Sequence, residues 1–569
     1  MINKNTIFLA ILSIFFLSSC APSTSSWESS SSSSTTGWNY NDRKQGGFQN
    51  VKNYKEQIPG PGLMFVEGGR LTMGRVEEDV MYDWNNISKT VTVSSFYIDE
   101  TEVRNIDYVE YLEWIKKHYI YGNSVFFTGI YWPEIYKDAL PDTLVWRDKL
   151  GENELFVNNY LRNPAYRDYP VVGVSWEQAN DYCIWRTDRV NERILIDAGL
   201  VMEVTHEERE NSDQVFTTDG YLHGSEDYLA YFVTDKQKGK IKNLNVLKDD
   251  DEGRYTNMED GLLLPNYRLP TEAEWEHAAL GYIGNDVGEN HEQRKIYPWN
   301  GSSLRNSTRQ NQGQIMANFK RGRGDNMGVA GSLNDDADIT SPVRSYWPND
   351  YGLYNMAGNV SEWVADVYRP VTEQTTTSDH RPFRGNVFKT HLKNDDLGQG
   401  ENPYEIDSLG HIKQTEVNPN DNLYRRNYKK SNNINYLDGD IESQMTDNNK
   451  STNIIDENSD ADNSTINIDK RNLGKDASGD TVNVRDFGNS NEMYDYGNTT
   501  LISDNSRVYK GGSWKDRAYW LNPGTRRFLD QSQSSDCIGF RCAMDRLGPS
   551  KSELKSNQRR GTDYSKRKQ

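Results

Sequence analysis

The spacing of apolar side chains changes along the chain, and each change marks a predicted strand or helix. Residues 64–74 (MFVEGGRLTMG) are typical of an apolar strand, a Gly-Gly turn and a second strand. Residues 91–100 alternate between apolar and polar positions, which predicts a strand with one buried face. From residue 105 to 119 the apolar side chains recur every three or four positions, which predicts a helix. The face that this helix would bury carries Tyr108, Leu112, Ile115 and Tyr119.

Two further helices are predicted together with their start signals. Ser175 and Gln178 form a capping-box pattern at the start of SWEQANDYCIWRTDRVNERI, and Thr271 and Glu274 repeat it in LPTEAEWEHAAL. In both segments apolar residues recur at helical spacing, so we expect helices that bury one face. The buried stripe expected for the first of them consists of Trp176, Ala179, Cys183, Val190 and Ile194.

Three stretches have the opposite composition. Ser23 to Thr36 is rich in serine and threonine, which is typical of a flexible tether. Residues of about 191–264 are polar and show no clear periodicity, and residues of about 370–505 are dominated by Asn, Asp, Ser and Lys. Such a composition cannot bury enough apolar surface to offset the entropy of ordering the chain. We therefore expect most of the third stretch to be disordered, or ordered only by a partner.

The N-terminus has the pattern of a secretion signal. Lys4 precedes an apolar run from Ile7 to Leu17, which as a helix would span only about 16 Å, roughly half of a bilayer core. A signal peptide over residues 1–19 therefore fits better than a membrane span. The small residues before Cys20 resemble a bacterial lipobox, which predicts lipidation of Cys20 and a tether over residues 20–59. Ala21, rather than aspartate, is compatible with sorting to the outer membrane. An ordinary cleaved signal with an incidental cysteine is the alternative.

The charge of the chain limits its partners. The formal net charge is −19, which disfavours nucleic acid as a partner because phosphates require a positive field. The C-terminal tail, residues 546–569, is locally basic. A charged terminus of this kind indicates a solvated tail or one that docks on a partner.

Eight segments, in order, resemble the formylglycine-generating enzyme (sulfatase-modifying factor) family. They are MFVEGGRLTMG, SSFYIDETEV, YPVVGVSWEQANDYCIW, YRLPTEAEWE, YPWNG, SPVRSYWPNDYGLYNMAGNVSEWV, RVYKGGSW and IGFRCAMD. The resemblance implies one irregular α+β domain of the C-type-lectin-like kind over residues of about 60–545. The polar stretches at about 191–264 and 370–505 then become loop insertions within that domain.

Further segments resemble the gliding-motility lipoproteins of the Bacteroidetes, of the GldJ type, with the GldK-type paralogue as the second possibility. These segments are VMYDWNN, LPDTLVWR, NYLRNPAYRDYPVVGVSW and WRTDRVNER. This resemblance implies a lipoprotein anchored at the periplasmic face of the outer membrane. Its implied partners are envelope proteins of the gliding and type IX secretion machinery, including a paralogous lipoprotein.

The cysteines bear on the chemistry that the first resemblance implies. The family's enzymes oxidise a substrate cysteine with two cysteines that follow the GGS segment and hold copper. The matching positions here hold Asp516 and Leu521, so we expect no catalytic residues, no oxidase activity and no copper. Cys537 and Cys542 resemble a displaced pair by spacing. The match of GFRCA and DYCIW to the family instead implies a disulfide between Cys542 and Cys183, with Cys537 free.

The resemblance also implies calcium, which takes hard oxygen donors. One site would use the side chains of Asn355 and Glu362 and the carbonyls of Gly358 and Val360. The alternative is that Glu362 caps or salt-bridges locally and that no ion binds. A second, altered site would use the four residues Asn318, Phe319, Asp335 and Ala337, in which Asp336 could replace Asp335.

Three functions remain open at this stage. The first is a non-enzymatic scaffold that joins envelope proteins, with the insertions and the basic tail as contact surfaces. The second is a module that binds a peptide or glycan in the degenerate substrate groove, formed by Trp514, Asp516, Trp520 and Leu521. The third is an enzyme with a different chemistry.

Overall fold

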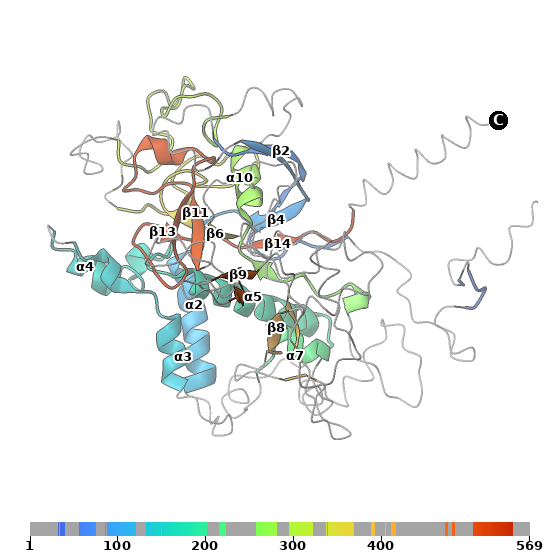
Figure 1. Cartoon of the computed structure of the whole chain (residues 1–569). Helices are drawn as coiled ribbons and strands as arrows, with labels where there is room; N and C mark the ends of the chain where they lie inside the picture. The colour runs from blue at the N-terminus through green and yellow to red at the C-terminus, as the bar shows by residue number, and fades with distance from the viewer. Residues whose placement is uncertain are drawn as a thin grey trace, which may run out of the picture.

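The computed structural model contains mixed helices and strands, which confirms the predicted α+β class (Figure 1). The structure describes residues 32–33, 35–39, 56–75, 86, 88–120, 132–148, 151–201, 215–223, 258–281, 295–321, 337, 339–368, 389–392, 404–405, 411–416, 473–475, 481–483 and 505–549. The predicted signal peptide, the predicted lipidation site Cys20 and most of the insertion at 370–505 lie outside these residues.

One four-stranded sheet joins the two ends of the domain. Its strand order is β1-β4-β14-β5, all antiparallel, with β1 at Leu63–Val66, β4 at Phe96–Asp99, β14 at Ala543–Asp545 and β5 at Tyr267–Arg268. Since β14 pairs with β4 across more than four hundred residues of sequence, the C-terminal segment completes a sheet begun at the N-terminus.

A second four-stranded sheet has the order β12-β11-β6-β13. Its strands are β12 (Arg527–Asp530), β11 (Ser506–Lys510), β6 (Ser361–Val367) and β13 (Ile538–Gly539). β13 runs parallel to β6, and the other pairs are antiparallel. β6 is buried along nearly its whole length, so the sheet lies inside the domain.

The predicted segment 64–74 forms two strands, but they enter different sheets. β2 (Gly69–Met73) pairs with β3 (Lys89–Val93) in a two-stranded sheet, whereas β1 pairs with β4. The single strand predicted at 91–100 is therefore wrong in one respect, because β3 and β4 divide that segment between two sheets.

The helices follow the predicted patterns closely at their starts. α5 (Trp176–Asp197) and α10 (Glu272–Leu280) begin with the predicted capping boxes, at Ser175 with Gln178 and at Thr271 with Glu274. α2 (Asn105–Ile115) buries Tyr108, Leu112 and Ile115 of the predicted face and continues as a π-helical turn, η3 (Lys116–Ile120), in which the side chain of Tyr119 is not described. Shorter helices are α3 (Trp132–Ala139), α4 (Glu154–Asn159), α7 (Thr218–His223), η4 (Thr143–Trp146), η5 (Pro164–Tyr166), η6 (Met258–Asp260) and η12 (Ala518–Leu521).

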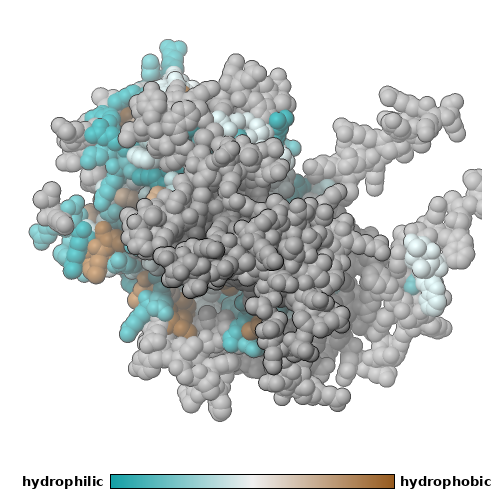
Figure 2. All heavy atoms as spheres, viewed as in Figure 1, coloured by the Kyte–Doolittle hydropathy of each residue, from teal (hydrophilic) through white to brown (hydrophobic). Residues whose placement is uncertain are grey.

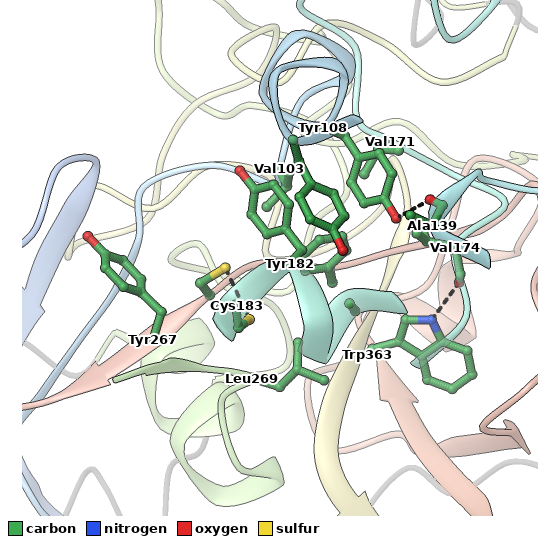
Figure 3. Packing of buried hydrophobic residues seen from close by; sticks show 14 of the residues in the cluster. Val103, Tyr108, Ala139, Val171, Val174, Tyr182, Cys183, Tyr267, Leu269 and Trp363 are labelled. Atoms are coloured by element: carbon green, nitrogen blue, oxygen red, sulfur yellow. Dashed lines mark hydrogen bonds between the residues drawn. The ribbon is translucent and has the colours of Figure 1, made fainter. Parts of the chain in front are cut away.

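Aromatic side chains make the contact between α2, α5 and the C-terminal segment. The ring of Tyr182 stacks on Tyr108 at 5.6 Å and meets Phe540 edge-on at 5.4 Å between centroids. Tyr108 donates to Ala139 O, so its buried hydroxyl is satisfied (Figure 3). Trp363 of β6 reaches the same cluster and donates to Val174 O. The core therefore fixes α2 and α5 against both sheets.

The insertion at 191–264 contributes more structure than its composition predicts. α5 runs on to Asp197, and its buried Asn191 accepts from the Leu264 amide at 2.9 Å. Asp188 accepts from the Thr218 amide at the start of α7. A small apolar cluster that includes Phe216 packs against Leu195 at the C-terminal end of α5. Polar side chains of α5 are thus buried because they hold the backbone of the insertion.

The described parts of the insertion at 370–505 include two short strand pairs. β7 (Lys389–His391) pairs with β8 (Gln414–Glu416), and β9 (Leu473–Lys475) pairs with β10 (Thr481–Asn483). His391 of β7 contacts His223 of α7, with ring centroids 5.1 Å apart. The two insertions therefore touch each other.

On the face that Figure 2 shows, the visible described residues are mostly hydrophilic, with scattered apolar side chains. Figure 2 shows apolar groups among hydrophilic ones at the end of the molecule where α4 lies, and Leu144 and Leu155 are exposed there. Among the helices that the structure describes, none has the length and hydrophobicity needed to cross a bilayer.

Candidate functional site

The segment from Asn355 to Glu362 is a tight turn that leads into β6. Asn355 and Asn359 both have positive φ, at 53° and 64°, a region that asparagine tolerates better than most residues. Gly358 has φ 79°, and a Cβ at this position would lie 2.4 Å from the carbonyl oxygen of Asn318. The turn is therefore pressed against the segment that holds Asn318.

The side chain of Asn359 joins three segments that are distant in sequence. Its Oδ1 accepts from the Ser341 amide at 2.7 Å and from Asn318 Nδ2 at 3.3 Å. Its Nδ2 donates to the Glu102 carboxylate at 3.0 Å. Asn355 Nδ2 donates to the same carboxylate at 2.8 Å. These residues form one buried polar cluster of the described part of the chain.

Glu102 and Ser341 are members of this cluster that the sequence did not identify, and Glu102 carries the unusual chemistry. Its side chain is 1% exposed, and the desolvation of its carboxyl, followed by the charge of Glu362, raises its pKa to about 8. Arg541 lowers the pKa by a smaller amount. The signal available in the sequence was a glutamate just after a predicted strand, in the family-like segment SSFYIDETEV.

Glu362 forms a buried ion pair with Arg541. Arg541 Nε donates to Glu362 at 2.6 Å, its Nη2 donates to the second carboxylate oxygen, and neither side chain is exposed. Trp275 Nε1 also donates to Glu362, at 2.7 Å. Glu362 therefore makes the local salt bridge that was the alternative to calcium binding, and its charge is already shared with a guanidinium.

Two buried amide oxygens fit a cation nonetheless. Asn355 Oδ1 and Asn318 Oδ1 have no hydrogen-bond partner among the described residues, and both belong to the predicted calcium ligands. A buried oxygen without a donor is costly, and Ca²⁺ takes such amide oxygens. Phe319 and Ala337 are also buried, whereas Asp335 lies outside the described residues. No three His, Cys, Asp or Glu side chains in the described ranges are grouped for a metal ion.

Asp516, which the sequence resemblance places at the first catalytic-cysteine position, lies in a charged network. Asp516 accepts from Arg527 Nη1 at 2.7 Å and Nη2 at 2.6 Å, and also from the amide and hydroxyl of Ser513. A bidentate pair of this kind holds its carboxylate in one orientation.

Leu521, which the resemblance places at the second cysteine position, lies in an enclosed apolar environment. Leu521 is 0% exposed and packs in a cluster with Ile315 and Phe319. Gly512, with φ 69°, allows the backbone to approach Trp520 closely, because a Cβ there would lie 2.8 Å from the Trp520 oxygen. The structure thus encloses Leu521 and leaves little room for a reacting thiol at this position.

The tryptophans of the degenerate groove are packed rather than open. Trp514 is 8% exposed, stacks on Trp146 with centroids 6.1 Å apart, and donates to Asp536 O. The guanidinium of Arg527 covers the Trp520 ring at 4.5 Å. These contacts leave little ring surface for a peptide or glycan to stack on.

Cys537 lies close to this groove but has the character of an inert thiol. Burial and then the charge of Asp536 raise its pKa well above the usual range, although Lys515 opposes this. The thiol donates to Asp536 at 3.2 Å. A thiol kept protonated is a poor nucleophile and a poor copper ligand.

Cys183 and Cys542 are brought together, as the predicted disulfide requires. Their Sγ atoms lie 3.4 Å apart in the buried contact between α5 and the start of β14 (Figure 3). Both are thiols in this structure, and burial raises the pKa of Cys183. A disulfide would need the sulfurs at about 2.05 Å. The bond itself stays a prediction.

Comparison of the sequence with known proteins shows which protein family it resembles. Residues 47–409 match the family model described as "Sulfatase-modifying factor enzyme 1-like domain". "Formylglycine-generating enzyme" of Mus musculus is 24% identical over 341 residues, which are 57% of this chain and 66% of the relative. "Inactive C-alpha-formylglycine-generating enzyme 2" of Mus musculus is 26% identical over 340 residues, 57% of this chain and 73% of the relative.

The coverage of these relatives is incomplete. The match spans less than two thirds of the mouse enzyme and 58% of the formylglycine-generating enzyme of Bos taurus. Among solved structures, PvdO from Pseudomonas aeruginosa aligns with a TM-score of 0.35 at 14% identity, over 85% of this chain and 94% of that one. Treponema denticola variable protein 1 aligns with a TM-score of 0.31 at 16% identity, over the same shares of the two chains.

Proposed function

Because the chain belongs to the sulfatase-modifying factor enzyme 1-like domain family, whose members include proteins named as inactive, we propose that it is a non-catalytic structural protein. In this proposal it is a lipoprotein, anchored through Cys20 to the periplasmic face of the outer membrane. It acts as a component of a gliding-motility and type IX secretion apparatus, whose other envelope proteins, including a paralogous lipoprotein, are its partners.

The observation that carries the non-catalytic part is the fate of the two matching cysteine positions. Asp516 is bound by Arg527 and Ser513, and Leu521 is fully buried. Neither side chain offers the soft thiolate that Cu(I) prefers. The apparatus and the location rest on the lipobox and on the likeness to gliding-motility lipoproteins.

Calcium has a structural role in this proposal. The cation would be held by oxygens of Asn355, Gly358, Val360 and Glu362, and a second one by Asn318, Phe319 and Ala337 with an aspartate of the loop between them. The two unpartnered oxygens of Asn355 and Asn318 support this assignment. Bound Ca²⁺ would supply charge to the buried polar cluster and fix the turn before β6.

Co-purification from native membranes tests the scaffold role. A tagged, lipidated chain should come out in a stoichiometric complex with the paralogous lipoprotein and secretion components, identified by mass spectrometry. Variant Cys20→Ser, which cannot be acylated, is the control for membrane attachment. A monomer from the lipidated chain would contradict the scaffold role.

The catalytic question needs a separate experiment. We expect no oxidation of a cysteine-containing peptide when copper is added to the purified chain. Turnover above the rate of free copper would contradict the non-catalytic assignment.

Variant Trp514→Phe tests the alternative function, a module that binds a peptide or glycan in the degenerate groove. Peptide or glycan binding that is lost in this variant would favour the binding module.

A further inference from the structure

The chain contains a single Asn-Gly step, at Asn300 and Gly301, and both residues are exposed. The step forms the tip of a turn that is closed by a hydrogen bond of 2.8 Å from Trp299 Nε1 to Ser303 O. The ring of Trp299 stacks on Tyr297, with centroids 4.9 Å apart. The rings therefore hold the base of the turn and leave its tip in solvent.

Neither residue of the step is restrained by a hydrogen bond. The Asn300 side chain and the Gly301 amide make no hydrogen bond with the described residues. Gly301 has φ 91°, and a Cβ at its position would meet no atom within 4 Å. A glycine in open space leaves its backbone amide free to rotate toward the preceding side chain. The turn therefore does not keep the Gly301 nitrogen away from the Asn300 carboxamide.

A second asparagine a few residues further on, Asn306, is held in place. Its Oδ1 accepts from Thr308 N at 2.9 Å and from Thr308 Oγ1 at 2.7 Å. Its backbone amide donates to Gln314 O at 2.8 Å. An asparagine side chain bonded to the amide two positions on must lose those bonds before it can turn toward the amide of the next residue, here Ser307. The structure thus distinguishes two asparagines of one short segment.

We propose that Asn300 is a site of spontaneous deamidation in the folded protein. The Gly301 nitrogen loses its proton to a base of the solvent and attacks the Asn300 Cγ, so that a C–N bond closes a succinimide ring and the side-chain nitrogen leaves as ammonia. Water then opens the ring at either carbonyl, which gives aspartate or isoaspartate at this position. The reaction consumes only water, and asparagine is one of the thermolabile residue types.

The modification changes the surface beside the degenerate groove. Tyr297, Trp299 and Ala518 pack against an apolar cluster that contains Leu521. Both products add a negative charge to the turn, and isoaspartate also lengthens the backbone by a methylene group. The hydrogen bond that closes the turn must adapt to this longer path. The inference depends on neither the scaffold role nor the calcium sites.

Timed incubation of the full lipidated chain, in detergent and mildly alkaline buffer, tests the proposal. An endoprotease that cuts after lysine releases residues 296–320 as one peptide, in which fragment ions separate Asn300 from Asn306. Deamidation at Asn300 should proceed within about tenfold of its rate in a free peptide of residues 296–305, because the turn adds less than about 1.4 kcal/mol to the barrier. Isoaspartate should appear among its products.

Asn306 is the internal control. In the folded chain its deamidation should be at least about tenfold slower than in a free peptide of residues 302–311, because its two bonds to Thr308 must break first. Variant Asn300→Gln keeps an exposed amide but would close a larger ring, so the modified form should no longer accumulate.

Either of two results would overturn the inference. One is a rate at Asn300 in the folded chain that is more than about tenfold below that of its free peptide, which would mean that the turn protects the step. The other is equal slowing of Asn300 and Asn306 relative to their free peptides, because then the hydrogen bonds of Asn306 do not distinguish the two residues.

Discussion

Removing one partner of the ion pair between Arg541 and Glu362 should destabilise the domain strongly. Both side chains are fully buried, and Arg541 also donates to the carbonyl oxygens of Asp99 and Tyr354. Substitution Arg541→Met has a similar volume but leaves the Glu362 carboxylate buried, with Trp275 as its remaining donor. Breaking a buried pair in this way costs about 3–5 kcal/mol, because an uncompensated charge stays in a dry site.

Urea unfolding of the chain without its first 20 residues, followed by tryptophan fluorescence, measures this cost. Arg344→Met is the control, because Arg344 is 63% exposed and pairs with Glu100 at the surface. It should cost less than about 1 kcal/mol. Adding Glu362→Gln to Arg541→Met removes the stranded charge and keeps an acceptor for Trp275, so the double variant should recover at least about 1 kcal/mol.

The reasoning is refuted by either of two results. One is a cost for Arg541→Met as small as that of Arg344→Met, which would mean that the Glu362 carboxylate left without Arg541 is not penalised by its burial. The other is a double variant whose cost equals the sum of the two single variants, because then Arg541 and Glu362 do not act on each other.

Three further predictions concern other sites. A non-reducing peptide map of the oxidised protein should show a Cys183–Cys542 disulfide. Reducing this bond should lower the free energy of unfolding by about 3–6 kcal/mol in the chain-entropy model. Cys183→Ser should show no such dependence on oxidation. Burial lowers the pKa of His277, whose Nε2 lies 2.8 Å from Glu67 O. The unfolded chain therefore binds more protons than the folded chain below about pH 6.5. The free energy of unfolding should fall from pH 7 to pH 5, and it should fall less in His277→Gln. Chelating calcium should lower the melting temperature, and it should lower the free energy of unfolding by up to about 2.7 kcal/mol if the ion was present at 100 times its Kd. An unchanged melting temperature in the wild type would contradict the proposed site, and so would an equal effect of chelation in Asn355→Ala.

The sequence was most reliable where a structure depends on residues a few positions apart. The capping boxes at Ser175 and Thr271 formed as predicted, because each needs only its own residue and the one three positions later. The segment at 91–100 was read as one strand, because alternation does not show where a chain changes sheet. The polar residues of α5 near Asn191 were read as the start of a loop, although they are buried against the insertion.

The candidate site was foreseen in its residues but not in its contacts. The likeness to the family indicated Asn355, Asn318 and Glu362, and it indicated that Asp516 and Leu521 replace cysteines. It gave no hint that Glu102 joins Asn355, since these residues are 253 positions apart.

The sequence by itself determined the family and the helix starts, because these depend on residue identity and local spacing. Only the tertiary structure decided which charges are buried together, such as Arg541 with Glu362 from 179 positions away. Pairing, desolvation and cavity shape are set by contacts between distant segments. For that reason the pKa of Glu102 and the packing of Trp514 became visible only in the folded chain.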